Sequence, residues 1–189
     1  MKITMEVELI EEAGYRSALR GLSLNKKQTK DMASIARRLA HFDGGHNKFL
    51  EMMYIWIEVK GARYFWAEAD TYRMSVKSSE STMHTLIKEL ENNDLTDECF
   101  EQGSVDEAYL NLIKQKLNIK DETEKLVGVK QILPEGFLQK RVWCMNYKTL
   151  RNITQQRHNH RLPHWQSFIK QILSQIEHPE FIIDDKEIK

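Results

Sequence analysis

The sequence predicts a single α/β domain over residues 1–189. Three segments alternate apolar and polar residues as half-buried strands do, and between them apolar residues recur at helical spacing. The chain of 189 residues is long enough to bury a hydrophobic core without disulfides or metals. Glycine (8 residues) and proline (3 residues) are scarce, so little of the chain is suited to flexible linkers.

The first third of the chain is predicted to contain two strands and a helix. Residues 2–9 alternate strictly, which predicts a strand with one hydrated face. A helix is expected over about 32–40, where apolar residues fall at helical spacing and Thr29 can cap the first turn. The clearest strand signal is at 53–59, and we expect Gly61 to end that strand.

The next part of the chain is predicted to be mainly helical. Residues 62–70 form a short aromatic helix, and we expect its aromatic residues 64–66 in the core rather than as a platform for stacking bases. The serine-rich stretch 75–81 is expected to be a loop that leads into a helix. The inward face of that helix is expected to carry Met83, Leu86, Ile87 and Leu90.

Further signals mark two helices and a third strand. Ser104 and Glu107 form a capping box at the start of one helix. Another helix ends at Pro134, because proline cannot continue a helical hydrogen-bond ladder. Residues 140–146 alternate again and predict a strand.

A polar helix predicted at about 147–160 has two interpretations. Apolar residues are sparse in it, so it is either a solvated surface helix or the lining of a polar cavity. The usual exposure of polar faces favours the surface. Pro163 then opens a final amphipathic helix. An acidic C-terminal tail begins at about residue 179, and we expect it to be solvated from Asp184.

The net charge of zero conceals a local excess of positive charge. The whole chain has 28 Lys and Arg residues against 28 Asp and Glu residues. Residues 130–170 contain eight Lys or Arg residues and one acid, Glu135, so this segment carries +7 and the remainder −7. The excess suggests an anion-binding site. A nucleic-acid-binding protein is disfavoured, because the total charge is zero and no binding motif is recognisable.

Other classes of protein and site are also disfavoured. No apolar run reaches the ~18 residues of a membrane span, and the N-terminus lacks the apolar stretch of a signal peptide. Two cysteines cannot form a disulfide framework, so we expect a reducing compartment and a cytoplasmic protein. Cys144 is expected to be a buried structural cysteine. His158, His160 and His164 match no known zinc spacing, so no metal site is predicted.

Three blocks of the sequence share their order and spacing with one known family. The first is Gly45-His46, followed by Phe49-Leu50-Glu51 and a strand. The second is residues 71–83, which read T-Y-R-M-S-V-K-S-S-E-S-T-M. Against the signature R-H-R-x-x-S-x-N-x-x-S-x-R, Arg73 and Ser81 match, and Ser78 stands where the signature has Asn.

The third block is the most complete. Leu133-Pro134 is followed at the spacing of the family's L-P and N-x-R-x-L-x-N-x-x-x-x-R elements by Asn146, Lys148, Leu150, Asn152 and Arg157. Trp165 resembles the Trp of a following A-Q-W motif. Together the three blocks, over about residues 46–165, resemble the flavin-dependent thymidylate synthases.

The resemblance implies a fold and an activity. The fold is an antiparallel sheet surrounded by helices, in a homotetramer whose active sites form between subunits. In this family, reduced FAD assists the transfer of a one-carbon unit from methylenetetrahydrofolate to C5 of dUMP, with NADPH as reductant. The flavin performs the chemistry, and the protein binds, orients and polarises the reactants.

The resemblance also implies a role for individual residues. Arg157 would be the catalytic residue, because it would hold the pyrimidine and stabilise negative charge as it develops on the ring. The cofactor-binding positions would be His46, Arg73, Ser78, Asn146, Lys148 and Asn152. The substrate-binding positions, besides Arg157, would be Glu68, Ser81 and Lys130.

This sequence departs from the family pattern where ligands would bind. Thr71 and Tyr72 replace an Arg-His pair, and Met83 replaces an arginine of the presumed phosphate site. Glu68 stands in place of a glutamine, and its charge would repel a phosphate. Two hypotheses therefore stay open: a flavin-dependent enzyme acting on a pyrimidine deoxynucleotide, or a non-catalytic protein that binds or sequesters a nucleotide on the same scaffold.

Overall fold

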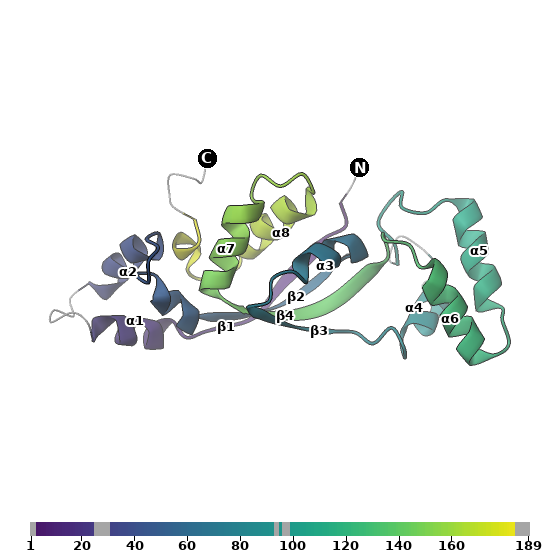
Figure 1. Cartoon of the computed structure of the whole chain (residues 1–189), viewed down its shortest axis with the longest axis horizontal. Coiled ribbons are helices and arrows are strands. Elements are labelled where there is room, and N and C mark those ends of the chain that lie inside the picture. The colour runs from purple at the N-terminus through teal and green to yellow at the C-terminus, as the bar shows by residue number, and fades with distance from the viewer. Residues whose placement is uncertain (1–2, 25–30, 93–94, 96–98, 184–189) are drawn as a thin grey trace. The chain divides into compact units, whose positions relative to one another are not determined.

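The predicted class of fold is confirmed by a computed structural model, which describes residues 3–24, 31–92, 95 and 99–183. Four strands form an antiparallel sheet in the order β1-β2-β4-β3 (Figure 1). The strands are β1 (Glu6–Ala13), β2 (Tyr54–Ala62), β3 (Ser75–Ser79) and β4 (Leu138–Asn146).

Helices make up most of the remaining described chain. Two short 3₁₀ helices are η1 (Lys48–Met52) and η2 (Pro179–Phe181). The α-helices are α1 (Tyr15–Ser23), α2 (Met32–Ala40), α3 (Arg63–Ala69), α4 (Leu86–Asn92), α5 (Glu107–Leu117), α6 (Glu122–Ile132), α7 (Tyr147–Arg157) and α8 (His164–Leu173).

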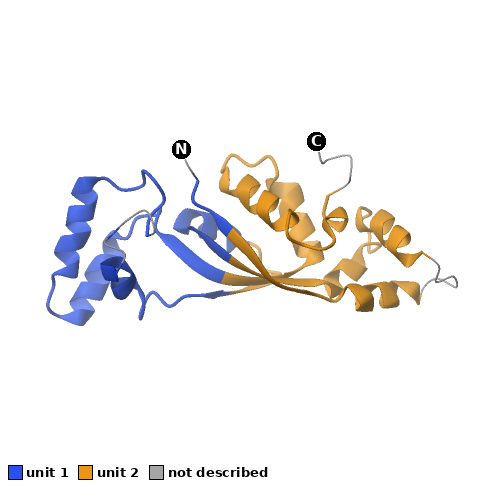
Figure 2. Ribbon diagram, turned by 180° about the vertical axis from the view of Figure 1, so that it is seen from behind, with its two compact units in different colours: residues 1–6, 59–71, 78–141 blue, residues 7–58, 72–77, 142–189 orange. Residues whose placement is uncertain are grey.

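The chain divides into two compact units, which are coloured separately in Figure 2. Unit 1 comprises residues 1–6, 59–71 and 78–141. Unit 2 comprises residues 7–58, 72–77 and 142–189. Each of the four strands contributes residues to both units. The single domain expected from the sequence stays a prediction.

Unit 2 is built on the apolar faces of β2 and β4. The alternation predicted for β2 is confirmed, since Met53, Ile55 and Ile57 are fully buried. On β4 the buried face carries Trp143 and Met145. The apolar sides of α7 and α8 are also buried, and the Phe168 ring of α8 lies 5.5 Å from that of Trp143.

A tight turn joins β1 to α1 in unit 2. Its residue Gly14 has a φ of 100°, in the left-handed region. A Cβ at this position would lie 2.1 Å from the carbonyl oxygen of Met52. Only glycine fits, because any other side chain would meet both the strained backbone conformation and this clash. Helix α1 itself was not predicted.

Unit 1 has its own apolar core, to which α4, α5 and α6 all contribute. Leu86 and Leu90 point inward from α4, as predicted. The buried members of the core are Leu86, Leu90, Leu95, Cys99, Phe100, Ile113, Val129 and Phe137. The expectation that Met83 also points inward is wrong: its side chain is 59% exposed, because it precedes α4 instead of lying within it.

The boundaries of β2 and α2 differ from the sequence-based expectation. Strand β2 continues through Gly61, where a Cβ would lie only 3.2 Å from Met5 Cε, so the glycine permits a close approach and does not end the strand. Asp31 caps α2 by accepting a hydrogen bond from Ser34 N at 3.2 Å. Thr29, the expected cap, lies outside the described residues.

Two further expectations are corrected. Residues 75–79 form the edge strand β3 instead of a loop, because this segment pairs with β4. The cap of α5 is Asp106, whose Oδ1 accepts from Tyr109 N at 2.8 Å, so Ser104 does not cap this helix.

The C-terminal segment is packed up to the last described residue. Phe181 and Ile182, at the start of the expected acidic tail, are 1% and 2% exposed and so belong to the core. The acidic residues from 184 lie outside the described part of the chain.

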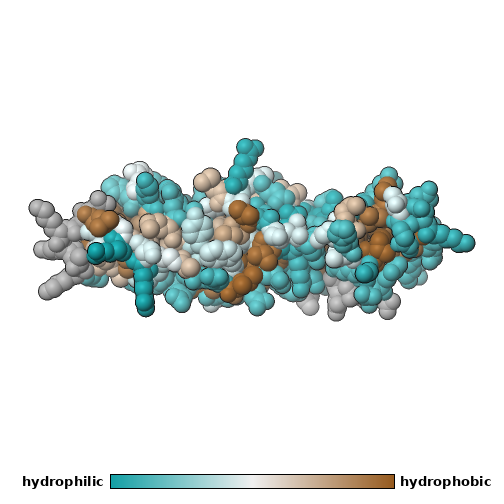
Figure 3. Space-filling view, turned by 90° about the horizontal axis from the view of Figure 1, so that it is seen from below, coloured by the Kyte–Doolittle hydropathy of each residue, from teal (hydrophilic) through white to brown (hydrophobic). Residues whose placement is uncertain are grey.

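In Figure 3 most of the visible surface is hydrophilic, and the apolar side chains form separate patches. Among the described residues, the most exposed apolar side chains include Met74 (77%) and Val76 (72%), at the start of β3. No helix in the described part of the chain is both long enough and apolar enough to span a bilayer.

Candidate functional site

Asn146, one of the predicted cofactor-binding residues, is the N-cap of helix α7. The backbone of Asn146 is extended, and its Oδ1 accepts a hydrogen bond from Thr149 N at 2.9 Å. This bond satisfies one of the N–H groups that a first helical turn leaves without a partner in the helix. Asn146 therefore fixes the direction in which α7 leaves β4.

Helix α7 is neither fully solvated nor polar on every side. Its buried residues are Tyr147, Thr149, Leu150, Arg151, Ile153 and Thr154. The predicted cofactor residues Lys148 and Asn152 are one turn apart, so they lie on the same side of the helix, and Asn152 is exposed. The helix thus packs through one face and presents polar side chains on the other.

Lys148 reaches from the first turn of α7 to the 3₁₀ helix η1. Its Nζ lies 2.6 Å from Glu51 Oε1, and the two side chains are 40% and 43% exposed. A cation is unfavourable near a helix N-terminus, where the helix dipole is positive, and the carboxylate of Glu51 offsets that cost. Because of this ion pair, an anion that approaches Lys148 also meets the negative charge of Glu51.

Glu51 and the predicted cofactor residue His46 line the same hollow in unit 2. The hollow has a volume of about 290 Å³. Exposed His46 follows Gly45, whose φ of 91° produces a sharp turn. The lining residues are Gly21, Leu22, Gly45, His46, Lys48, Phe49, Glu51 and Met52.

A second arginine of α7, which the sequence did not single out, is more buried than Arg157. Arg151 is 6% exposed, and its guanidinium donates to Gln155 Oε1 at 3.1 Å. Its Nη1 also lies 3.7 Å from Asp43 Oδ1. Arg151 therefore ties α7 to the loop before η1, and this role is structural.

Arg157, the predicted catalytic residue, lies at the C-terminal end of α7 among three side chains. Its Nε donates to the Tyr72 hydroxyl at 2.7 Å, and its Nη1 lies 2.7 Å from His160 Nε2. The guanidinium carbon is 5.0 Å from the Trp165 ring centroid and 5.6 Å from that of Tyr72. Arg157 is partly exposed, so a cation in a defined orientation borders the solvent.

The two other histidines near Arg157 in the sequence, His158 and His164, have different surroundings. His158 Nδ1 is 3.0 Å from the backbone oxygen of Gln155, and His164 is fully buried. Within the described residues, no group of three or more His, Cys, Asp or Glu side chains has the arrangement of a metal site.

Arg73, a predicted cofactor residue, is exposed directly after Tyr72.

Two predicted substrate-binding residues of unit 1 are associated with the segment before α4. Lys130 Nζ lies 3.1 Å from Met83 Sδ. The carbonyl of Ser81 accepts from the backbone N–H groups of His84 and Thr85, both at 2.9 Å. Ser81 therefore lies in the turn that leads into α4, and its side chain is exposed. The predicted cofactor residue Ser78 is exposed on β3.

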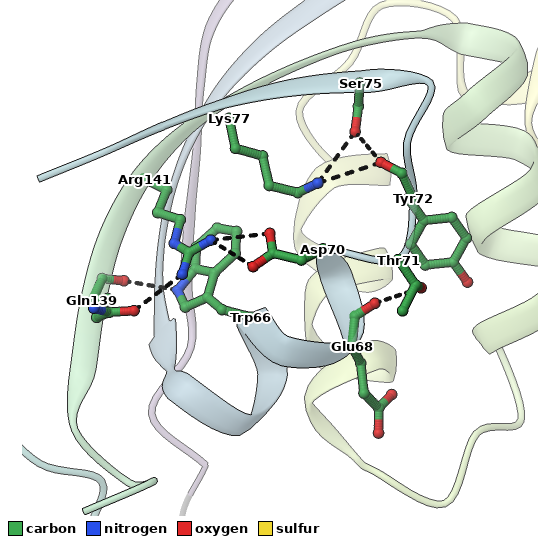
Figure 4. A network of polar contacts seen from close by, with 9 residues as sticks. All are labelled: Trp66, Glu68, Asp70, Thr71, Tyr72, Ser75, Lys77, Gln139 and Arg141. Atoms are coloured by element: carbon green, nitrogen blue, oxygen red, sulfur yellow. Dashed lines mark hydrogen bonds and ion pairs between the residues drawn. The ribbon is translucent and has the colours of Figure 1, made fainter. Parts of the chain in front are cut away.

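Glu68, the third predicted substrate-binding residue of unit 1, belongs to a polar network around α3 (Figure 4). The Thr71 hydroxyl donates to the carbonyl of Glu68 at 2.7 Å and so completes the C-terminal turn of α3. Arg141 binds the Asp70 carboxylate with Nη1 at 3.0 Å and stacks 4.5 Å from the Trp66 ring centroid. Thr71, which stands where the signature has arginine, therefore serves the helix end.

Within unit 2, Figure 4 also shows Lys77 directed toward the backbone of the 72–75 turn. Its Nζ lies 3.4 Å from the Tyr72 carbonyl and 3.3 Å from Ser75 Oγ. The ammonium also lies 4.7 Å from the Trp143 ring centroid. Lys77 thus stabilises the turn that carries Tyr72.

Cys144 lies on β4 and is partly buried. Burial raises the pKa of its thiol above the ordinary value of 9.0. A raised pKa lowers the thiolate fraction at neutral pH and so makes the sulfur a poor nucleophile. This agrees with the structural role expected from the sequence.

Tyr72 and Glu51 are the functional neighbours that sequence reasoning did not assign. Tyr72 counted only as a mismatch to the signature, yet it contacts Arg157. Glu51 was part of a resembling block, but nothing in its spacing indicated an ion pair with Lys148. Both contacts join segments about 85 to 97 residues apart in the chain, which no local pattern reveals.

A comparison with known protein families identifies the family of this chain. A family profile described as thymidylate synthase complementing protein matches residues 5–178. The chain therefore belongs to that family, the flavin-dependent thymidylate synthases. No characterised protein matched in a comparison of curated proteins.

Solved structures agree in fold. The chain is similar to flavin-dependent thymidylate synthase ThyX of Helicobacter pylori in complex with FAD and dUMP, with a TM-score of 0.78 at 18% identity over 95% of this chain and 98% of that one. A second structure of ThyX from Helicobacter pylori with FAD and dUMP gives a TM-score of 0.77 at 18% identity, over 96% and 98%.

Proposed function

We propose that the protein is a flavin-dependent enzyme that transfers a one-carbon unit from methylenetetrahydrofolate to C5 of a pyrimidine deoxynucleotide, dUMP or a related nucleotide. The observation that carries the proposal is the setting of Arg157, a partly exposed guanidinium held by Tyr72, His160 and Trp165. The similar structures that contain FAD and dUMP support the choice of ligands.

The residues of unit 2 fit a flavin nucleotide in their chemistry. FAD would be held by the polar side of α7, through Asn146, Lys148 and Asn152, and by His46 at the hollow beside Glu51. Amide and ammonium donors suit the polar edge of a flavin and its pyrophosphate. Bound FAD would supply the redox chemistry, with NADPH as reductant.

Arg157 would act on the nucleotide itself. Its guanidinium can donate hydrogen bonds to a pyrimidine carbonyl and stabilise the negative charge that develops on the ring as C5 becomes the nucleophile for the one-carbon unit. A cation that is already oriented does this without reorganising during the reaction. Arg157 is therefore assigned both catalytic and substrate-binding roles.

Ser81 and Lys130 are the residues assigned to the phosphate of the nucleotide. Ser81 offers an exposed hydroxyl in the turn before α4, and Lys130 contacts the same segment through Met83. A phosphate would need both, because Glu68 introduces negative charge among the substrate-binding positions.

A second function, non-catalytic nucleotide binding, is favoured by a separate observation. Thr71 is engaged in completing α3, and Met83 contacts Lys130, so two positions with arginine in the signature have uncharged side chains in structural use. A protein with fewer phosphate contacts could still bind and sequester a nucleotide.

Purified protein separates the two functions. A flavin absorbance spectrum, or uptake of added FAD, followed by conversion of dUMP to dTMP with methylenetetrahydrofolate and NADPH, supports the enzyme. Thermal stabilisation by dUMP without FAD binding or turnover supports sequestration; a ligand at 100 Kd adds about 2.7 kcal/mol. Protein that binds neither ligand rejects both.

We also propose that the protein is a homotetramer with sites between subunits and that it works in the cytoplasm. Light scattering after size-exclusion chromatography measures the first, and a fluorescent fusion in cells locates the second. A monomer in solution would overturn the proposed shared sites.

A further inference from the structure

A directed chain of hydrogen bonds joins two of the predicted site residues in unit 2. Arg157 Nε donates to the Tyr72 hydroxyl at 2.7 Å, and that hydroxyl donates to Gln156 Oε1 at 3.1 Å. Gln156 Nε2 then donates to Asn152 Oδ1 at 3.0 Å. The chain thus runs from the residue assigned to the pyrimidine to a residue assigned to the flavin.

The direction of this chain is fixed by the chemistry of its members. The Gln156 oxygen can only accept, so the single hydroxyl proton of Tyr72 points to it. The lone pairs of the hydroxyl then remain for Arg157 Nε, which can only donate. Tyr72 is 9% exposed, so water has little access to compete for these bonds.

Two aromatic rings also lie close to the same guanidinium. Its carbon lies 5.0 Å from the Trp165 centroid and 5.6 Å from that of Tyr72, within the range of cation–π attraction. The two rings meet edge-on, with centroids 5.8 Å apart and planes at 75°. Tyr72 therefore contacts Arg157 through both its hydroxyl and its ring.

We infer that Tyr72 is a positioning residue for Arg157: it orients the guanidinium for the pyrimidine. The inference rests on the proposed function. It gives a role to a position where this chain departs from the family signature, which has histidine there. An oriented guanidinium binds its ligand more tightly than one that must be ordered on binding.

The test uses the Tyr72→Phe variant of the full chain, which keeps the ring and removes only the hydroxyl. We expect dUMP affinity to fall about three- to tenfold while FAD affinity stays within about twofold. In an Arg157→Ala background, Tyr72→Phe should have no further effect on dUMP binding, because Tyr72 acts through Arg157. Calorimetry on wild type, both single variants and the double variant gives all four affinities.

Tyr109→Phe is the matched control. The Tyr109 hydroxyl also donates to a partly buried partner, the Ile132 carbonyl, in unit 1, and neither residue is assigned to a ligand. It should lower thermal stability as Tyr72→Phe does and leave dUMP affinity unchanged. If Tyr72→Phe also leaves dUMP affinity unchanged, or weakens it equally with and without Arg157, the inference is wrong.

Failure of the proposed function has a separate signature. If wild-type protein binds no dUMP, the proposed function is rejected. The positioning role of Tyr72 is then tested with phenylglyoxal, a reagent that modifies arginine. Peptide mass spectrometry measures the rate at which it modifies Arg157. Faster modification in Tyr72→Phe supports the positioning role. An unchanged rate overturns it, whatever the ligand.

Discussion

Lys148 and Glu51 form an ion pair of 2.6 Å between α7 and η1. The pair places a carboxylate beside the cation that we assign to the flavin. Both side chains are about two-fifths exposed, so the pair contributes little to stability and mainly changes the local charge.

Replacing that carboxylate is expected to strengthen cofactor binding. Glu51→Gln leaves the Lys148 charge uncompensated, so we expect FAD affinity to rise about threefold at low salt and less at high salt. The free energy of unfolding should change by no more than ~1 kcal/mol. Glu122→Gln, which breaks the surface pair with Lys125, is the control that should leave FAD affinity unchanged. Weaker FAD binding in Glu51→Gln would show that Glu51 itself contacts the cofactor.

Removing the Arg157 side chain is expected to abolish turnover and to weaken nucleotide binding about a hundredfold, to an affinity that calorimetry still measures, while the protein stays folded. Arg157→Ala loses the only cation that we assign to the pyrimidine. Its partial exposure limits the cost in stability to about 1–2 kcal/mol, mostly from lost ring contacts. Thermal unfolding and a dUMP turnover assay measure the two effects. A fully active Arg157→Ala protein would contradict the site assignment.

Substitutions of Asn146 separate its two roles. Asn146→Ala removes the cap of α7 and should lower the free energy of unfolding by about 1 kcal/mol. Asn146→Asp keeps a capping oxygen and places a negative charge favourably at the helix N-terminus, so stability should be retained. Its charge should nevertheless weaken FAD binding. Chemical denaturation and FAD titration give both values, and normal FAD binding by both variants would limit Asn146 to the cap.

Gly14→Ala is expected to destabilise the protein by at least ~2 kcal/mol. The new Cβ would meet the Met52 carbonyl oxygen at 2.1 Å and force a residue with a φ of 100° into strain. Gly44→Ala is the matched control, because its φ is 73° but no atom lies within 4 Å of the new Cβ. It should cost about 1 kcal/mol. Urea denaturation compares them; equal losses would show that the close contact can relax.

The stability of the protein is expected to fall in alkaline solution through Tyr147. Burial, and then its hydrogen bond to Glu12, raise the pKa of Tyr147 far above the ordinary 10.0. A raised pKa stabilises the protonated folded state, and this contribution is complete below pH 10 and declines as the pH rises above it. Unfolding free energies measured from pH 8 to 11 should show the decline.

Two phenylalanine variants test whether Tyr147 causes that decline in stability. Tyr147→Phe should make the slope above pH 10 shallower, whereas Tyr54→Phe, at an exposed position, should leave it as in wild type. Identical slopes in all three proteins would show that folding does not raise the pKa of Tyr147.

Periodicity in the sequence was sufficient where burial alone decides the structure. The alternation of Met53, Ile55 and Ile57 correctly predicted β2, and the spacing of apolar residues correctly predicted α2 and α8. The periodicity of such residues shows which face of an element is buried, so the element is predicted without knowing which other element packs against that face.

The same reasoning failed where a neighbour distant in sequence decides. Residues 75–79 are short, serine-rich and read as a loop, but pairing with β4 makes them a strand. Gly61 read as a strand end, but Met5 and Phe65 approach it and the strand continues. Tertiary contacts override such weak local preferences.

The sequence by itself determined the class of fold, the order of most elements and the family, through Leu133-Pro134 and the spacing from Asn146 to Arg157. Only the tertiary structure decided which side chains surround those residues: Glu51 against Lys148, and Tyr72 and Trp165 against Arg157. The physical reason is that elements form from short-range periodicity and capping, whereas the charge and orientation of a site depend on side chains brought together by folding.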